Sequence, residues 1–159
     1  MRLWHKDLIK VLPRQQLLSQ WRECCCVAKN LAKNGTPNHI LVNEITKYTP
    51  FHFETYTNMV LNEMEKRNYK ISEKALSNFR KNFNMYDATI DDTKIPKSYW
   101  LNANLDNLYC FWHNSRYFFQ CYYNLQEKYD RGMFSNDEWL KICKVAKKYA
   151  NIDYGDWSF

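Results

Sequence analysis

The sequence predicts an all-α protein, a single compact domain of about four to five helices with an aromatic-rich C-terminal tail. Three observations support this prediction. Apolar residues recur with the 3.6-residue period of an α-helix, no alternating strand pattern persists, and 159 residues is the length of one ordinary domain. Because the chain has only 3 Gly and 4 Pro and no obvious linker, we expect residues 1–159 to form that one domain.

The clearest helix is expected from Arg14 to Lys33. It follows Pro13, which suits the start of a helix because its φ is already helical and its missing N–H has no intrahelical partner there. Apolar residues spaced four, three, four and three apart form one stripe, and Asn34-Gly35 ends the helix. The stripe comprises Leu17, Trp21, Cys24, Ala28 and Leu31.

Two further helices are expected in the middle of the chain. The first runs from about Phe51 to Asn68, and the second covers Glu73 to Phe83 with Ser72 as its N-cap. The residues expected to be buried on the first of these are Phe53, Thr57, Val60, Leu61 and Met64. The stretch from Tyr86 to Tyr99 contains Ile95-Pro96 and is expected to be an extended connector.

The C-terminal third is expected to contain two more helices. A long one runs from about Asn104 to Asp130, and a last one continues through about Tyr149. The segment Ser135-Asn136-Asp137-Glu138 matches a capping box, which opens the last helix. The aromatic residues of the tail are Tyr154, Trp157 and Phe159.

Composition narrows the functional class. Aromatic residues make up 17% of the chain, and 23 Lys and Arg against 17 Asp and Glu give a net charge of +6. This combination is compatible with nucleic-acid binding, because cations hold phosphates and rings stack on bases, although charge alone does not establish it. No apolar run reaches the roughly 18–20 residues that span a bilayer. The N-terminus lacks the apolar core of a signal peptide, so we expect an intracellular protein with no membrane partner.

Several possible sites have simpler explanations. The six cysteines are expected to be free thiols in a reducing compartment. Cys110 and His113 have the spacing of metal ligands, but structural zinc needs four ligands and no second pair is evident. We therefore expect no metal and no cofactor. The last helix has a basic side that either contacts phosphates or faces solvent. That side comprises Lys141, Lys144, Lys147 and Lys148.

Glu23 lies on the polar face of the first helix, roughly 140° from the centre of the apolar stripe. Taken alone it is a solvated glutamate beside Arg22, the ordinary role of a surface charge. Its sequence context favours a second interpretation.

The first 23 residues carry a distinctive set of motifs. An early arginine, Arg2, is followed by Gln15-Gln16-Leu17-Leu18 and then by Trp21-Arg22-Glu23. Further on, an aromatic and Glu-rich segment spans Phe51 to Ile71, and a connector with Asp91 and Ile95-Pro96 spans Thr89 to Trp100. Together these segments resemble the pyrimidine-dimer DNA glycosylase/AP-lyase family of phage type, with the resemblance strongest over residues 1–100.

The resemblance implies a compact helical DNA repair enzyme that excises a damaged pyrimidine from an ultraviolet-induced dimer and nicks the strand. In that family the terminal α-amine attacks the anomeric carbon of the sugar, the base departs, a Schiff base forms, and β-elimination cuts the strand. The resemblance implies that Met1 supplies the amine here and that Glu23 is the catalytic carboxylate.

The resemblance also implies the DNA contacts. It assigns Arg2, Gln15 and Arg22 to DNA binding, and we expect Arg116 to bind DNA as well. The expected partner is double-stranded DNA with ultraviolet lesions or abasic sites, bound by a monomer.

The proposed chemistry suits these residue types. An α-amine has a reference pKa of about 7.7–8.0, against about 10.4 for lysine, so a useful fraction is unprotonated at neutral pH. A nearby carboxylate can stabilise the positive charge that develops on the sugar and can move protons. Two residues depart from the family pattern. A bulky second residue, Arg2, normally blocks removal of Met1, and Cys26 replaces a basic residue.

Two other functions are compatible with the sequence. One is a non-catalytic nucleic-acid-binding helical protein on the same scaffold. The other is a protein-interaction module whose aromatic residues form a surface for a partner. Trapping of a covalent adduct with DNA by borohydride distinguishes the enzyme from the non-catalytic binder.

Overall fold

The computed structural model describes residues 1–99 and 106–150. These contain five α-helices and four short 3-10 helices, and no strand lies within the two described stretches. The α-helices are α1 (Arg14–Asn34), α2 (Pro50–Lys66), α3 (Glu73–Asp87), α4 (Ser115–Asp130) and α5 (Asn136–Ala146). The 3-10 helices are η1 (Lys6–Val11), η2 (Asn43–Lys47), η3 (Asp92–Lys94) and η4 (Lys97–Tyr99). The predicted all-α class is confirmed.

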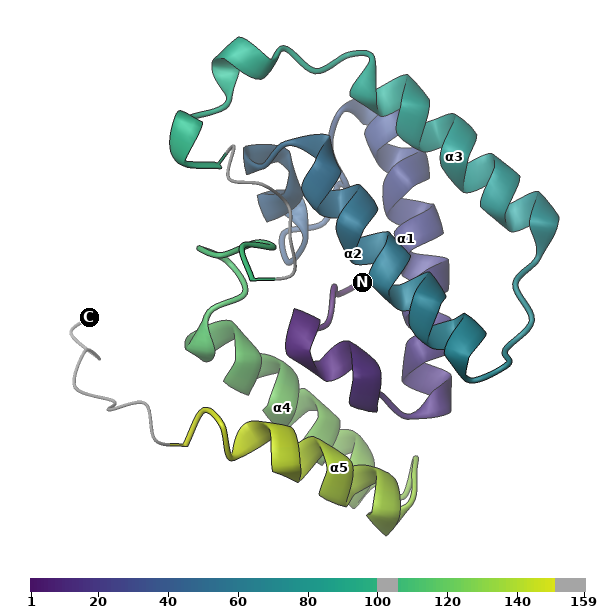
Figure 1. Ribbon diagram of the computed structural model, residues 1–159, viewed down its shortest axis with the longest axis vertical. Coiled ribbons are helices and arrows are strands. Elements are labelled where there is room, and N and C mark those ends of the chain that lie inside the picture. The colour runs from purple at the N-terminus through teal and green to yellow at the C-terminus, as the bar shows by residue number, and fades with distance from the viewer. Residues whose placement is uncertain (100–105, 151–159) are drawn as a thin grey trace.

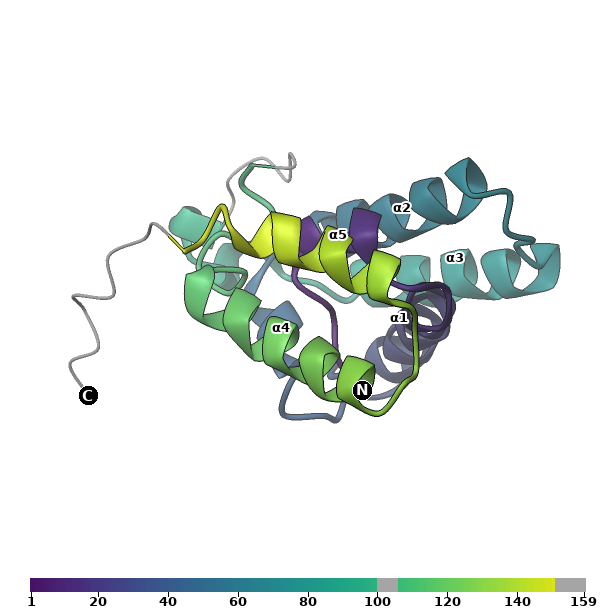
Figure 2. The ribbon, with the colours of Figure 1, turned by 90° about the horizontal axis from the view of Figure 1, so that it is seen from below.

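The helices form two groups with the N-terminal segment between them. Helix α1 packs against α3 and α2, while α4 and α5 lie side by side. Helix η1 contacts both α2 and α5 and so joins the two groups (Figures 1 and 2). A single hydrophobic cluster runs through all of these elements. In the described part of the chain, no helix is long and apolar enough to cross a membrane.

The first three predicted helices are confirmed. All five residues of the predicted apolar stripe of α1 are buried. Helix α1 ends at Asn34 and is capped by Gly35, whose φ of 68° lets its N–H bond to the Leu31 carbonyl, a conformation that glycine adopts without strain. The Ser72 hydroxyl caps α3 by accepting from the Ala75 N–H. The capping box of α5 is also present, with Ser135 and Glu138 bonded reciprocally.

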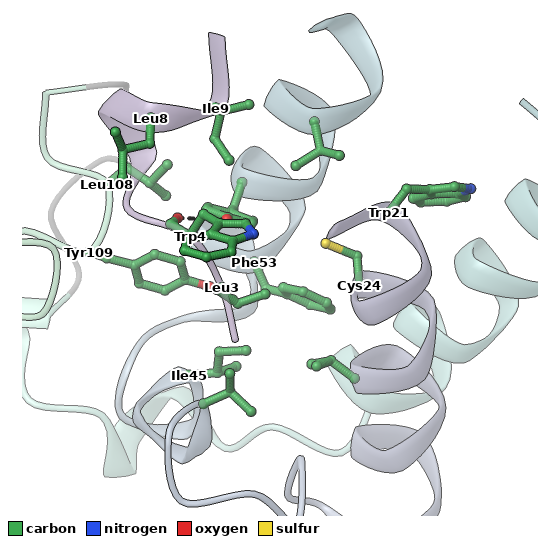
Figure 3. Packing of buried hydrophobic residues seen from close by; sticks show 14 of the residues in the cluster. Leu3, Trp4, Leu8, Ile9, Trp21, Cys24, Ile45, Phe53, Leu108 and Tyr109 are labelled. Carbon is green, nitrogen blue, oxygen red and sulfur yellow. Dashed lines mark hydrogen bonds between the residues drawn. The ribbon is translucent and has the colours of Figure 1, made fainter. Parts of the chain in front are cut away.

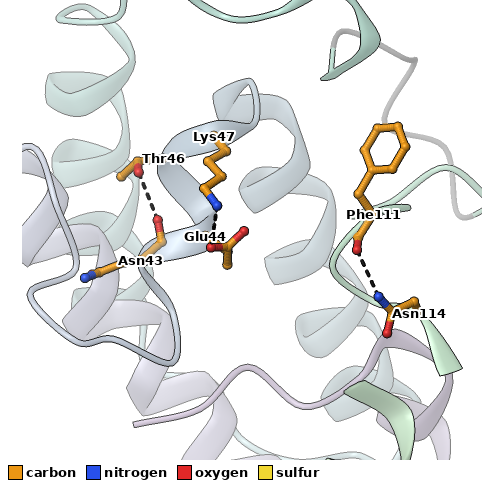
Figure 4. Close-up of polar contacts among 6 residues, drawn as sticks. All are labelled: Asn43, Glu44, Thr46, Lys47, Phe111 and Asn114. Carbon is orange, nitrogen blue, oxygen red and sulfur yellow. Dashed lines mark hydrogen bonds and ion pairs between the residues drawn. The ribbon is translucent and has the colours of Figure 1, made fainter. Parts of the chain in front are cut away.

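The predicted long helix from Asn104 to Asp130 is wrong over the described part of its first half. Helix α4 begins only at Ser115, because Asn114 caps it by accepting from the Tyr117 N–H. The Asn114 amide also donates to the Phe111 carbonyl at 3.0 Å (Figure 4). Tyr109 has a φ of 51°, which no α-helix contains. Its fully buried ring and its N–H bond to His52 fix this conformation, so tertiary packing overrides the local helical pattern.

The predicted extended connector from Tyr86 to Tyr99 is also partly wrong. Helix α3 continues through Asp87 because the Tyr86 ring is buried. The connector then contains the two short turns η3 and η4, and the Asp91 carboxylate caps η3 by accepting from the Thr93 N–H. The last helix ends at Ala146, before the expected Tyr149. The aromatic tail expected at Tyr154, Trp157 and Phe159 lies outside the described residues.

Arg67, directly after α2, ties three segments together. Its Nε donates to the carboxylate of Glu63 at 2.7 Å, and its other two nitrogens donate to the carbonyls of Leu12 and Lys10 at 2.7 and 2.8 Å. The Glu63 side chain is only 10% exposed. Because the arginine satisfies a mostly buried carboxylate and two carbonyls before α1, we expect it to stabilise the fold measurably.

We predict that Arg67→Met lowers the free energy of unfolding by about 2–3 kcal/mol, since it leaves the Glu63 charge without its partner. Arg131→Met is the matched control. Its pair with Glu127 has the same i,i+4 spacing but is 70% and 56% exposed, so the expected loss is below about 0.5 kcal/mol. Urea unfolding followed by circular dichroism measures both. Equal losses in the two variants would contradict the structural role of Arg67.

Candidate active site at the N-terminus

The N-terminal segment crosses α1 at Glu23. The Arg2 backbone N–H donates to Glu23 Oε2 at 2.7 Å, and Glu23 is partly buried. Covalent geometry therefore keeps the Met1 amine within about 6.5 Å of that carboxylate. Within residues 1–99 and 106–150, no lysine or arginine forms an ion pair with Glu23. The structure thus brings together the amine and the carboxylate that the sequence singled out, 21 residues apart in the chain.

Leu3 and Trp4 anchor this segment in the core. Leu3 is fully buried and Trp4 is 6% exposed. They enter the cluster among Phe53, Leu8 and Tyr109 (Figure 3). An apolar anchor directly after the first two residues fixes where the chain terminus lies, because moving it would expose two large side chains to water.

Side chains from three helices bind the backbone of this segment. Gln20 of α1 accepts from the Trp4 N–H at 2.8 Å and donates to the Arg2 carbonyl at 3.1 Å. The Tyr117 hydroxyl of α4 donates to the Leu3 carbonyl at 2.5 Å, and the Tyr56 hydroxyl of α2 donates to the Trp4 carbonyl at 2.7 Å. Burial raises the pKa of both tyrosines far above the usual value, so both hydroxyls keep their protons.

The roles of Gln20, Tyr56 and Tyr117 were not predicted from the sequence. Gln20 carried a recognisable signal: it lies three residues after Leu17 and four before Cys24, inside the apolar stripe, and it is fully buried. A polar residue within such a stripe requires a partner, because an unpaired buried amide is costly. The two tyrosines had no comparable signal, since their contacts depend on how the helices pack.

Two histidines secure the next residues of the segment. His5 and His113 stack with ring centroids 5.1 Å apart, and His5 Nε2 lies 2.8 Å from the His113 carbonyl oxygen. The His113 Nδ1 accepts from the Lys6 N–H at 3.0 Å. Burial lowers the pKa of His5 to about 4 despite its bond to that carbonyl. Burial, together with the charges of His5 and Lys6, lowers the pKa of His113 well below 6.5. Both rings are therefore neutral at pH 7.

We predict that the protein loses stability as the pH falls from 7.5 to 5.5. In this window the unfolded chain protonates its histidines, near pKa 6.5, while folded His5 does not, near pKa 4. The unfolded state binds more protons, so stability rises with pH and falls with acid. His5 alone accounts for about 1.3 kcal/mol of loss, and His113 adds to it in the same direction. Urea unfolding at the two pH values measures the difference, and equal stabilities would contradict this prediction.

The predicted DNA-binding residues lie on two helices and on the N-terminal segment. Gln15 and Arg22 are both exposed on α1, seven residues or two turns apart on one side. Arg116 is exposed in the first turn of α4, next to Tyr117, which bonds to the N-terminal segment. Arg2 is partly buried: its guanidinium lies 5.8 Å from the centroid of the Trp4 ring and its Nη1 lies 3.9 Å from Cys121 Sγ. No described contact links Arg116 to Glu23 or to Met1.

The cysteines and histidines do not gather into a metal site within the described residues. All six cysteines are free thiols. Cys24 and Cys121 are fully buried, whereas Cys26 is exposed on α1. His113, which the sequence pattern paired with Cys110 as a possible metal ligand, uses its Nδ1 to accept from the Lys6 N–H.

Basic side chains away from the N-terminus are partly neutralised. The Lys47 ammonium lies 2.7 Å from the Glu44 carboxylate in η2 (Figure 4), and the Lys94 ammonium lies 3.6 Å from the Asp91 carboxylate. Both pairs are exposed and contribute little to stability, but they lower the local positive charge. The predicted basic side of α5 is exposed along its length.

Comparison with known proteins gives a family match over the N-terminal part of the chain. The model of the family described as pyrimidine dimer DNA glycosylase matches residues 1–77. This span includes Met1, Glu23, the whole of α1 and α2, and the start of α3. No curated protein and no solved structure matches the chain. The resemblance predicted from segments within residues 1–100 is confirmed over residues 1–77. The match, which covers just under half of the chain, supports the similarity of residues 1–77 to a family of DNA repair glycosylases.

Proposed function

We propose that this protein is a DNA glycosylase with AP-lyase activity, which excises a pyrimidine from an ultraviolet-induced dimer and nicks the strand through a Schiff base on the Met1 amine. One observation carries the proposal: the Arg2 N–H donates to Glu23 Oε2 at 2.7 Å, which holds the neighbouring amine beside a carboxylate. An amine and a carboxylate at this separation are the two groups that the reaction requires.

The first half of the reaction replaces a bond to the base with a bond to the protein. The unprotonated Met1 amine attacks C1′ of the sugar, and the C1′–N bond breaks with its electron pair going to the base, which takes up a proton. Positive charge develops on the sugar as the base leaves, and the Glu23 carboxylate stabilises it. The amine then loses a proton, and its lone pair forms the C=N bond as the C1′–O4′ bond breaks. The ring oxygen takes that electron pair and a proton, and C1′ becomes the carbon of a protonated imine.

The second half cuts the strand. Loss of a proton from C2′ of the imine allows the C3′–O bond to break, and the phosphate leaves with that electron pair. Water then hydrolyses the imine and returns the free amine. Glu23 is the group available to accept and return protons in these steps. The balance of atoms and electrons needs no oxidant, reductant or cofactor.

DNA binding is assigned to side chains around this centre. We propose that Arg22, Arg116 and Arg2 contact phosphates and that Gln15 contacts the duplex beside Arg22. The bound form is double-stranded DNA carrying ultraviolet lesions or abasic sites, and one protein molecule binds each site. Arginine suits this role because its planar fork binds phosphate oxygens in pairs. The proposed function places the protein in the compartment that holds DNA.

We predict that Arg22→Ala and Arg116→Ala each weaken duplex binding and reduce the slope of log affinity against log salt by about 1, because each removes one phosphate contact. Arg131→Ala is the matched control for Arg116. Arg131 is the C-cap of the same helix, roughly 22 Å farther along the axis, and its loss should leave both quantities unchanged. Fluorescence anisotropy at several salt concentrations measures them. Unchanged slopes in both test variants would remove these arginines from the interface.

A non-catalytic nucleic-acid-binding protein is the second candidate function. It is favoured by the exposed Cys26, which supplies no positive charge on the face of α1. Incubation with abasic-site duplex and borohydride separates the two candidates, because borohydride reduces an imine to a stable amine. A covalent protein–DNA adduct supports the lyase, whereas tight binding without an adduct supports the non-catalytic protein and overturns our proposal.

A further inference from the structure

We propose that Gln20 and Tyr117 are positioning residues, which hold the first residues of the chain so that the Met1 amine faces Glu23 and the DNA sugar. This inference rests on the proposed function. Neither side chain is proposed to touch DNA; each acts through the backbone of residues 2–4.

The N-terminal segment lacks the usual means of fixing a chain. Residues 1–5 belong to no helix or strand, so regular secondary structure does not satisfy their backbone groups. The N–H and C=O groups near the terminus are instead paired with side chains of α1, α2 and α4. A terminal segment without such bonds is ordinarily poorly ordered, whereas a nucleophile must lie within a narrow range of positions.

Gln20 binds this segment at two points. Its Oε1 accepts from the Trp4 N–H and its Nε2 donates to the Arg2 carbonyl, so one amide spans three residues. The Tyr56 hydroxyl lies 3.1 Å from Gln20 Oε1. The neighbouring donor and acceptor fix which end of the amide is which, because a flipped amide would leave both backbone groups unpaired. Gln20 therefore sets the path of the backbone on both sides of Leu3.

Tyr117 fixes the remaining carbonyl. Its hydroxyl donates to the Leu3 carbonyl from α4, across 114 residues of sequence. The ring is 7% exposed and packs against Trp112, with centroids 5.4 Å apart. With Glu23 on the Arg2 N–H, Gln20 on the Arg2 carbonyl and Tyr117 on the Leu3 carbonyl, side chains of both α1 and α4 hold the backbone directly after Met1.

Loss of either contact leaves a buried backbone group without a partner, and the segment shifts to regain one. A shift of about 1 Å at a reacting group can lower a rate by about 100-fold. The single-turnover rate of imine trapping should therefore fall by about 10- to 100-fold in Tyr117→Phe and in Gln20→Leu. The enzyme concentration that half-saturates this rate should change by less than about twofold, because the DNA-binding side chains are untouched.

Tyr149→Phe is the matched control. Its hydroxyl donates to the Asp7 carboxylate of η1, so it also ties a tyrosine to the N-terminal region, but beyond the first residues. Its ring is stacked on Phe118, with centroids 3.9 Å apart. Removal of this hydroxyl should leave the trapping rate unchanged. Thermal unfolding of all three variants reports whether each folds, and Gln20→Leu provides the test if Tyr117→Phe does not fold.

The outcomes are distinct. Folded test variants that trap slowly at saturation, beside a Tyr149→Phe control that traps normally, support the proposal. If the folded test variants trap at the wild-type rate, or if all three variants slow in proportion to their loss of stability, the positioning role is overturned and the proposed function stands. If the wild-type protein forms no adduct, the proposed function fails and the inference fails with it.

Discussion

Glu23→Gln is expected to lower the rate of base excision by at least about 100-fold, the cost typical of losing one group that stabilises transition-state charge. Glutamine retains the shape of the side chain, and its carbonyl oxygen can still accept from the Arg2 N–H that now bonds to Glu23 Oε2 at 2.7 Å. The N-terminal segment should therefore keep its position. The substitution removes only the negative charge that opposes the cation developing on the sugar.

DNA binding separates this effect from a general loss of function. Removing a negative charge near phosphates should leave duplex affinity unchanged or raise it slightly. Glu127→Gln is the control, because Glu127 is exposed and pairs with Arg131 at the far end of α4. Excision is measured under single-turnover conditions on a duplex with one dimer. If Glu23→Gln excises the base at the wild-type rate, Glu23 is an ordinary surface glutamate.

Acetylation of the Met1 amine is expected to abolish adduct formation altogether. The lone pair of an amide nitrogen is delocalised into the carbonyl, so the capped terminus can neither attack C1′ nor form an imine. The acetyl group is small and the phosphate contacts are unaffected, so binding to duplex should persist. This pattern differs from that of Glu23→Gln, in which the nucleophile is present but its counter-charge is missing.

The matched control for the acetylated protein is the same protein with a free N-terminus and a tag at the C-terminus. It is tested on the same abasic-site duplex with borohydride. A lysine nucleophile predicts that the acetylated protein still forms the adduct. Lys6 is the lysine nearest to the terminus in sequence, and its ammonium donates to the Asp106 carbonyl at 2.8 Å. Full trapping by the acetylated protein would therefore overturn the role of Met1.

Much of the fold could be predicted because its signals are local. The stripe of α1, the Ser72 cap and the capping box at Ser135 each depend on residues within a few positions of one another. The start of α4 could not be predicted in this way. Its position depends on the left-handed Tyr109, held by a contact with His52 across 57 residues of sequence.

The candidate site, like the fold, could be predicted from the sequence only in part. The sequence indicated Met1 and Glu23 through a family resemblance, whereas the helical periodicity alone predicts that Glu23 is a solvated surface glutamate. The structure shows it partly buried under the Arg2 N–H. The contacts of Tyr117 and His113 with the N-terminal segment span more than 100 residues of sequence, so only the packed fold reveals them. Gln20 is the exception, since its place in an apolar stripe was visible in advance.

Locating the covalent bond between protein and DNA tests the role of the Met1 amine directly. Wild-type protein is trapped on abasic-site duplex with borohydride, the adduct is digested with protease and nuclease, and the modified peptide is sequenced by mass spectrometry. We predict that the sugar remnant is attached to the α-amine of Met1, in the peptide that precedes Leu3. A remnant on a lysine side chain, or the absence of any adduct despite tight binding, would contradict it.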